Sequence, residues 1–181
     1  MTVPGAAAGT TPAGDATAVR IAQLSARGLT VAVAESLTGG LLVAELIRPA
    51  GASAVVVGGV VAYATELKHA VLGVDEDLLA SHGPVDPEVA RQMAAGVRTA
   101  LAVDGRTADI GISTTGVAGP DFQGDIAPGT VFLGVSTNTE CRAVELRLSG
   151  DRMTIRTDTV VAALALVAEA SASVKSGSVE N

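Results

Sequence analysis

The chain has 181 residues and a net charge of −7, and hydrophobic residues make up 48% of it. This length allows one domain with a sizeable core, but aromatic residues contribute only 2%, so Ala, Val, Leu and Ile must fill that core. The scarcity of aromatic rings excludes a stacking platform for single-stranded nucleic acid, and the acidic balance argues against a diffuse basic surface for a polyanion; small anionic ligands remain as candidates.

Neither end of the chain has the composition of a targeting signal. Residues 1–15 are rich in Ala, Gly, Thr and Pro and predict a disordered tail, residues 172–181 predict a flexible tail, and residues 16–171 predict a single domain. The longest apolar run, 54–62, is far shorter than the roughly 20 residues of a membrane helix. The single cysteine, Cys141, makes no internal disulfide, which favours a reducing compartment. We expect a soluble, cytoplasmic protein that binds neither membrane nor nucleic acid.

Helices and strands are predicted to alternate along the chain. Apolar periodicity and turn residues give a helix over 19–27, a strand over 30–34, a helix over 41–47, a strand over 54–62 and short helices over 66–72 and 76–80. Asp86 and Pro87, as N-cap and first helical residue, open a long helix to about residue 103. A strand over 108–113, a loop over 115–129, a hairpin of strands over 130–136 and 142–148, and a final helix to about residue 170 follow.

This order predicts an α/β fold, a three-layer α/β/α sandwich on a mixed, mostly parallel sheet. Gly58 and Gly59 lie inside the second strand, where they indicate a bulge or a close approach of another backbone. The loops that follow strands at Ser36, Tyr63 and Thr114 are expected to converge along one edge of the sheet, where such folds bind ligands.

The first candidate site lies where the first strand ends. An apolar run stops at Glu35 and Ser36, a turn of Thr38, Gly39 and Gly40 follows, and a helix begins after it. Such a junction exposes a hydroxyl while backbone N–H groups point at the same place, which suits a nucleophile or a bound anion. An ordinary helix cap has the same pattern, so both interpretations stay open.

The second candidate site combines Tyr63, the only tyrosine, with Lys68. No histidine is suitably placed, so if Ser36 is a nucleophile, Lys68 is the most reasonable base. A lysine at the ordinary pKa of ~10.4 is neutral only about once in 2,500 molecules at pH 7, equivalent to ~4.6 kcal/mol, so burial and nearby positive charge must lower its pKa. The alternative is an interfacial tyrosine beside a solvated lysine.

Two further segments suggest anion binding. The small-residue stretch 111–120, which includes Gly116, has N–H groups suited to an oxyanion hole or a phosphate cradle, although it matches neither the phosphate loop nor the dinucleotide pattern. Arg152 and Arg156 share one face at the start of the last helix, where they oppose the helix dipole and a bound anion or partner carboxylate would explain them. A glycine-rich turn and solvated arginines are the alternatives.

A metal site is not expected. His69 and His82 lack a second histidine or cysteine at metal-ligand spacing, and His82 precedes Gly83 at a predicted helix end. The position of His82 is explained by a favourable interaction of its polar or positively charged ring with the negative, carboxyl end of the helix dipole.

Taken together, five ordered motifs resemble the CinA C-terminal domain family, the competence/damage-inducible protein family, over residues from about 16 to 171. The motifs are Ala34-Glu35-Ser36-x-Thr38-Gly39-Gly40, Tyr63 with Lys68, Thr115-Gly116-Val117-Ala118-Gly119-Pro120, Pro128-Gly129-Thr130-Val131 and Gly150-Asp151-Arg152.

The resemblance implies an α/β/α sandwich on a mixed sheet, a homo-oligomer, and hydrolysis of the carboxamide of nicotinamide mononucleotide to nicotinate mononucleotide and ammonia, with neither metal nor cofactor. The nucleophile falls on Ser36 and the base on Lys68, while Tyr63, Ser53 and Thr115 fall on assisting positions. Arg152 falls on the arginine that contacts the phosphate side of the substrate. Backbone N–H groups around Thr38, Gly39 and Gly40 suit the oxyanion, and Gly116 completes the expected binding residues.

The sequence departs from the family pattern at three places. Leu37 stands where cysteine is common, Thr65 stands where asparagine is common, and the loop over 121–127 has less glycine. Thr65 and this loop favour the alternative of a catalytically silent nucleotide-binding or regulatory module. An amidohydrolase for a different amide is the third interpretation.

Overall fold

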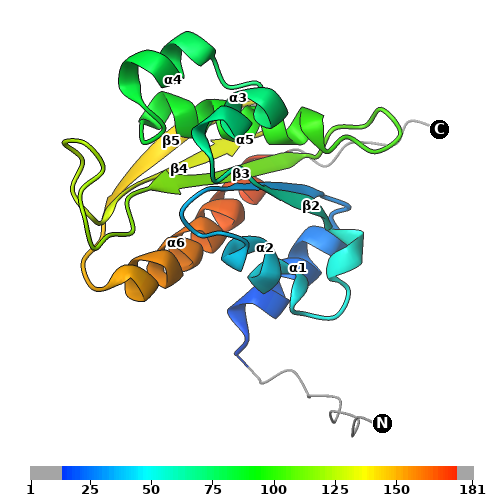
Figure 1. Ribbon diagram of the computed structural model, residues 1–181. Coiled ribbons are helices and arrows are strands. Elements are labelled where there is room, and N and C mark those ends of the chain that lie inside the picture. Colours follow the sequence, from blue (N-terminus) through cyan, green and yellow to red (C-terminus); the bar gives the residue numbers. More distant parts are fainter. Residues whose placement is uncertain (1–13, 175–181) are drawn as a thin grey trace, which may run out of the picture.

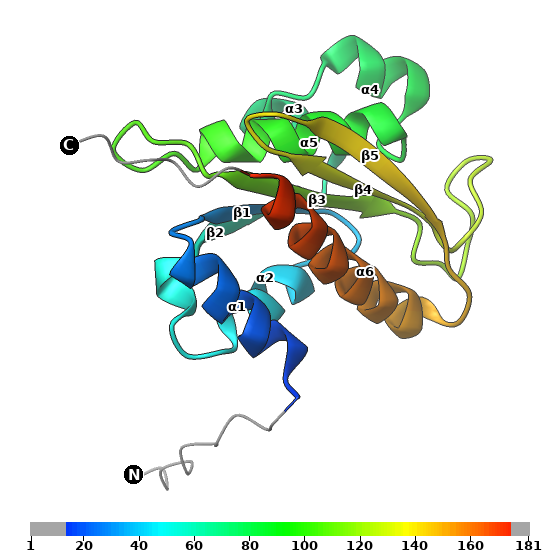
Figure 2. The same cartoon turned by 180° about the vertical axis from the view of Figure 1, so that it is seen from behind.

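The computed structural model describes residues 14–174 and shows a five-stranded sheet between two layers of helices (Figure 1). One layer contains α1 (Ala16–Ala26), α2 (Leu41–Ile47) and α6 (Arg152–Ser173), and the other contains α3 (Thr65–Leu72), α4 (Glu76–His82) and α5 (Pro87–Ala100), as Figure 2 shows from behind. The strands are β1 (Val31–Glu35), β2 (Val56–Val61), β3 (Ile110–Gly116), β4 (Thr130–Ser136) and β5 (Cys141–Arg147), and a 3-10 turn, η1 (Ala52–Ala54), precedes β2. The predicted three-layer sandwich is confirmed.

The sheet is mixed, with the strand order β2-β1-β3-β4-β5. β1 pairs in parallel with both β2 and β3, whereas β3–β4 and β4–β5 are antiparallel, so parallel pairing is confined to one half of the sheet. The carboxyl ends of β1, β2 and β3 therefore lie at the same edge of the sheet. This edge receives the segments that follow Glu35, Val61 and Gly116.

Local sequence signals explain where the helices begin. The Asp86 side chain accepts hydrogen bonds from the N–H groups of Glu88 and Val89, and Pro87 occupies the first helical position, as predicted. Asp151 caps α6 by accepting from Thr154 N at 2.8 Å. The expected irregularity in β2 is also present, because the register with β1 shifts next to Gly58.

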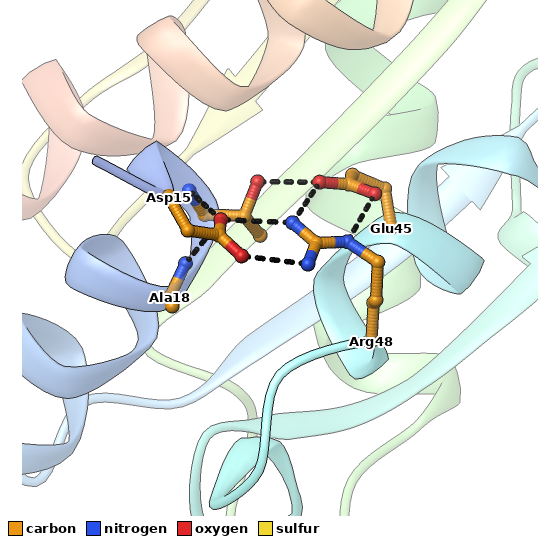
Figure 3. A network of polar contacts seen from close by, with 5 residues as sticks. Asp15, Ala18, Glu45 and Arg48 are labelled. Atoms are coloured by element: carbon orange, nitrogen blue, oxygen red, sulfur yellow. Dashed lines mark hydrogen bonds and ion pairs between the residues drawn. The ribbon is translucent and has the colours of Figure 1, made fainter. Parts of the chain in front are cut away.

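The predicted boundaries of the domain need correction at both ends. Asp15, which was predicted to lie in the N-terminal tail, caps α1. It also forms a bidentate ion pair with Arg48 at the end of α2, with N–O distances of 2.6 and 2.8 Å (Figure 3). Arg48 also binds Glu45, which accepts from Thr17 Oγ1. At the other end, α6 continues to Ser173, beyond the predicted limit. The rest of the predicted tails, 1–13 and 175–181, lies outside the described residues.

Helix α5 packs unusually close to the sheet because glycines face it. A Cβ on Gly111 would lie 2.0 Å from Ala94 O, and one on Gly134 would lie 2.0 Å from Ala90 O. Both carbonyls belong to α5, so β3 and β4 meet the backbone of that helix directly. None of the helices in residues 14–174 combines the length and the apolarity that crossing a membrane requires.

We expect Gly134→Ala to lower the free energy of unfolding by about 2–3 kcal/mol, because the added methyl group has no space against α5. Gly58→Ala is the matched control, since a Cβ on this strand glycine meets only Leu101 Cδ1 at 3.5 Å. Its stability should stay within about 1 kcal/mol of the parent protein. Urea unfolding followed by circular dichroism measures both values, and equal losses would contradict this account of α5 packing.

Candidate active site

Ser36 and Lys68 meet at the edge of the sheet where β1 and β2 end. Ser36 directly follows β1, and its N–H donates to Thr114 O of β3 at 2.9 Å. Lys68 lies in the first turn of α3, and its Nζ donates to Ser36 Oγ at 3.1 Å and to Ala62 O at 2.8 Å. The structure thus brings the predicted nucleophile and the predicted base into direct contact.

The Lys68 side chain is almost fully buried, with 1% of its surface exposed. This burial lowers the pKa of Lys68 from 10.5 to about 8, and the carboxylate of Glu66 opposes the shift by raising the pKa. At pH 7 about one molecule in ten then carries a neutral lysine, instead of about one in 2,500 at the ordinary pKa. Burial therefore supplies most of what a lysine base requires.

Glu35 organises the turn that carries Ser36. Its carboxylate is fully buried and accepts the N–H groups of Gly40 (3.0 Å), Leu42 (3.1 Å) and Val43 (2.9 Å). Three N–H groups at the start of α2 have no partner within that helix, and the carboxylate satisfies them. The positive end of α2 therefore faces Glu35 and not a substrate.

This arrangement corrects the role predicted for two glycines and leaves the N–H of Thr38 available, within residues 14–174, for the role predicted for it. The N–H of Gly40 is bound to Glu35, and the N–H of Gly39 donates to Ser36 O at 3.1 Å, so neither is free for an oxyanion. Thr38 is buried, and its hydroxyl is hydrogen-bonded to that of Thr114 at 2.8 Å. In the part of the chain that the structure describes, the turn's N–H groups without a hydrogen-bond partner are those of Leu37 and Thr38.

A cavity of about 330 Å³ opens beside the Ser36–Lys68 pair. Its volume lies in the range of small-molecule sites. The lining residues come from the ends of β1, β2 and β3, from the start of α3 and α6, and from two loops: Ser36, Leu37, Tyr63, Thr65, Lys68, Pro84, Val85, Thr115, Gly116, Val117, Ala118, Gly119, Pro120, Asp121, Gln123 and Arg152. A larger, mostly apolar cavity of about 540 Å³ between α1, α2 and α6 contains neither Ser36 nor Lys68.

Thr115 lines this cavity, but its hydroxyl is engaged elsewhere. Thr115 Oγ1 donates to Pro84 O at 2.6 Å and so fastens the loop between α4 and α5 over the site. This contact shapes the pocket wall; the assisting role of Thr115 stays a prediction, because a hydroxyl that donates one hydrogen bond still accepts others. Gly116 lies in the wall as expected.

Tyr63 and Arg152 meet at the mouth of the pocket. Tyr63 is 61% exposed, and its hydroxyl accepts a hydrogen bond from Arg152 at 3.2 Å. Arg152 also donates to Gly119 O at 2.9 Å, which ties the start of α6 to the loop after β3. A guanidinium at the rim suits the anionic end of a substrate whose other end reaches Ser36.

Arg156 has a different environment from Arg152. Its Nε donates to Leu37 O and one terminal nitrogen donates to Thr38 O, both at 2.9 Å. These two carbonyl groups, and not a bound anion or a carboxylate, account for the presence of Arg156 near the helix start.

Ser53 lies outside the site. It is an exposed residue of η1, which precedes β2, so it lies at the amino end of a strand whose carboxyl end carries the pocket. In this single chain Ser53 therefore does not line the pocket, and its contribution to substrate binding stays a prediction.

Sequence reasoning missed several residues of the site. Pro84 and Val85 enter the pocket from a loop that no local pattern marks, because their place depends on how α5 packs on the sheet. Ala62 contributes only a carbonyl group, which a sequence does not reveal. Glu35 had a signal, since a charged residue at the end of an apolar strand must find partners when it is buried.

We expect Glu35→Gln to lower the free energy of unfolding by about 2–3 kcal/mol, because an amide removes the charge and turns an N–H donor toward one of the three N–H groups. Asp151→Asn is the control, because Asp151 is an exposed cap and asparagine caps helices equally well. Thermal and urea unfolding compare the two variants. A Glu35→Gln protein as stable as the parent would show that the charge is dispensable.

Known proteins resemble this chain over most of its length. Residues 15–171 match the CinA C-terminal domain family. A CinA-like protein of Frankia casuarinae is 50% identical over 141 residues, which are 78% of this chain and 31% of that protein. A putative competence-damage inducible protein of Bacillus cereus is 48% identical over 134 residues, 74% of this chain and 31% of that protein. The chain thus spans about a third of the length of these curated relatives.

Solved structures share the fold. The competence/damage inducible protein CihA of Agrobacterium tumefaciens is 31% identical with a TM-score of 0.80, covering 90% of this chain and 99% of that one. The competence damage-inducible protein A (ComA) of Klebsiella pneumoniae is 32% identical with a TM-score of 0.81, covering 89% and 98%. On the match of residues 15–171 and on these relatives, the chain belongs to the CinA C-terminal domain family.

Proposed function

We propose that this protein hydrolyses the carboxamide of nicotinamide mononucleotide to nicotinate mononucleotide and ammonia, with Ser36 as nucleophile and Lys68 as base. The observation that carries the proposal is the 3.1 Å contact between Lys68 Nζ and Ser36 Oγ, made by a lysine with a lowered pKa at the wall of a pocket. A Ser/Lys pair of this kind activates a hydroxyl for attack on an acyl carbon. The names of the relatives state competence or damage induction and no substrate.

Neutral Lys68 carries two N–H bonds and one lone pair. Ala62 O accepts one N–H, which holds Nζ in place and leaves the lone pair to accept the Ser36 hydroxyl proton over the same 3.1 Å. As this proton moves to Nζ, Ser36 Oγ bonds to the carboxamide carbon and the carbonyl oxygen becomes an oxyanion. Backbone N–H groups of the Ser36 turn stabilise that charge.

The tetrahedral species then collapses. The C–N bond breaks, Lys68 returns its proton to the leaving nitrogen, and ammonia departs, which leaves an ester between the nicotinoyl group and Ser36. A water molecule attacks this ester while Lys68 takes its proton, and the proton passes back to Ser36 Oγ as the carboxylate product leaves. The balance is one amide and one water converted to one carboxylic acid and one ammonia.

The pocket is compatible with a phosphorylated substrate. Its reactive pair lies inside and Arg152 lies at its rim, so a molecule with a carboxamide at one end and a phosphate at the other spans the two features. The net charge of −7 fits this class of ligand, because one local cation suffices for a small anion whereas a polyanion needs many.

We expect Ser36→Ala and Lys68→Ala each to reduce ammonia release from nicotinamide mononucleotide by at least about 1,000-fold, because each removes half of the reacting pair. Ser53→Ala should keep the parent rate, since Ser53 lies outside the pocket. Coupled detection of ammonia measures all three proteins.

The same assay separates the alternatives. Turnover that survives Ser36→Ala would overturn the mechanism. Tight binding of the nucleotide without ammonia release by the parent protein would favour the silent module, and ammonia release from another carboxamide alone would identify a different amidase.

The rate of the reaction should rise with pH through a midpoint near 8, because only neutral Lys68 accepts the Ser36 proton and its pKa is about 8. Glu66 raises this pKa, so Glu66→Gln should move the midpoint to lower pH by a few tenths of a unit, a small shift since Glu66 is exposed. Glu76→Gln, on exposed α4, should leave the midpoint unchanged. A midpoint shifted to higher pH in Glu66→Gln would contradict the assignment of this rise in rate to the deprotonation of Lys68.

A further inference from the structure

Arg156 forms hydrogen bonds with the turn that carries the proposed nucleophile. The guanidinium donates to the carbonyl groups of Leu37 and Thr38, the two residues directly after Ser36. It also lies against Gly39, where a Cβ would be 3.3 Å from a guanidinium nitrogen and φ is +58°. The turn thus exposes its carbonyl side to α6 and has no side chain at the point of closest contact.

The directions of these carbonyl groups determine the directions of N–H groups. A trans peptide is planar, and its C=O and the following N–H point opposite ways. With Leu37 C=O held toward Arg156, the N–H of Thr38 points away from α6. In the same way, Ser36 C=O accepts from Gly39 N, which turns the N–H of Leu37 in the opposite direction.

The side of the turn away from α6 is the side of the reacting pair. Lys68 comes from α3, which lies in the opposite helix layer from α6 (Figures 1 and 2). Ser36 and Leu37 both line the pocket. Among residues 14–174, no acceptor takes the N–H of Leu37 or of Thr38. These two donors meet the requirement of an oxyanion hole, namely N–H groups already in place beside the nucleophile.

We propose that Arg156 is a positioning residue that directs the N–H group of Thr38 at the oxyanion formed when Ser36 attacks the substrate. The N–H group of Leu37, which the hydrogen bond from Gly39 N to Ser36 O orients, completes the pair of donors. The positive charge of Arg156 also polarises the two peptide groups whose carbonyl oxygens it binds, because a hydrogen bond to a carbonyl oxygen strengthens the N–H of the same peptide as a donor. These peptides carry the N–H of Thr38 and the N–H of Gly39, and the latter donates to Ser36 O. This inference rests on the proposed function of Ser36.

Two other roles for Arg156 are distinguishable from this one. A substrate ligand would line the pocket, whereas Arg152 does so and Arg156 does not. A simple anchor of α6 would affect stability without a selective effect on the transition state. The causes of the Lys68 pKa shift are burial and Glu66, so a change at Arg156 should leave the pH midpoint of the reaction in place.

The test compares Arg156→Gln and Arg156→Lys with the parent protein. Arg142→Gln is the control, because Arg142 is a surface arginine of β5 that pairs with Glu169. We expect Arg156→Gln to reduce kcat for ammonia release from nicotinamide mononucleotide about 100-fold, at the lower end of the effect of deleting one oxyanion donor. In Arg156→Gln, KM should change less than threefold and the pH midpoint of the reaction should not move. The kcat of Arg156→Lys should lie between those of Arg156→Gln and the parent protein. Arg142→Gln should have the kcat and KM of the parent protein.

A second measurement does not depend on turnover. Pyridine-3-boronic acid accepts Ser36 Oγ at boron while Lys68 takes the hydroxyl proton, which forms a tetrahedral anion like the reaction intermediate. We expect its dissociation constant, measured by calorimetry, to rise by a factor similar to the loss in kcat in Arg156→Gln. The affinity for the product, nicotinate mononucleotide, should change less than threefold, and Ser36→Ala should not form the adduct.

Several results would overturn the proposal. One is that Arg156→Gln keeps the kcat and the boronate affinity of the parent protein. Another is that Arg156→Gln keeps the parent kcat but has a raised KM and a weakened affinity for the product. If Arg156→Gln does not fold, Arg156→Lys decides by the same criteria. A parent protein that releases no ammonia but forms a boronate adduct weakened in Arg156→Gln would refute the proposed function and support the role of Arg156. A parent protein that does neither would refute both.

Discussion

The parallel register between β1 and β2 is the constraint on which the candidate active site depends. Glu35 is paired with Val61, and the N–H of Ala62 donates to Glu35 O at 2.8 Å. This pairing places the carbonyl group of Ala62 near the residue after β1, so one lysine nitrogen reaches both Ala62 O and Ser36 Oγ. A slip of one residue would turn the β2 side chains to opposite faces and remove this carbonyl. Lys68 tolerates its burial because both partners are in place, since an unpaired buried ammonium is strongly unfavourable.

Two charged side chains hold the Ser36 turn from different directions. Glu35 binds three N–H groups at the start of α2, whereas Arg156 binds two carbonyl groups on the side of α6. The charges complement the polarity of the groups they bind, and each lies on an element that the core fixes. Because Glu35 occupies the positive end of α2, charge stabilisation at Ser36 depends on N–H groups of the turn itself.

Sequence patterns predicted the layers, the helix starts at Asp86 and Asp151, and the approach of Ser36 and Lys68, because these follow from local periodicity, capping chemistry and family motifs. They failed where a role depends on which partner a polar group finds in three dimensions. The hydroxyl of Thr115 donates to a carbonyl group on another loop, and Ser53 lies in η1, before the amino end of β2 and away from the pocket. Neither fact has a signal in the spacing of residues.

The hydroxyl groups of Ser113, Thr114 and Thr115 help to shape the candidate active site. Side chains of a strand alternate between faces, so Ser113 and Thr115 point toward α5 while Thr114 points the other way. Ser113 accordingly donates to a carbonyl group of α5 and Thr115 to that of Pro84, both at 2.6 Å, whereas Thr114 is hydrogen-bonded to Thr38 in the Ser36 turn. One strand thereby fastens the pocket wall on one face and the turn on the other. β3, at the centre of the sheet, consequently links the pocket wall to the Ser36 turn.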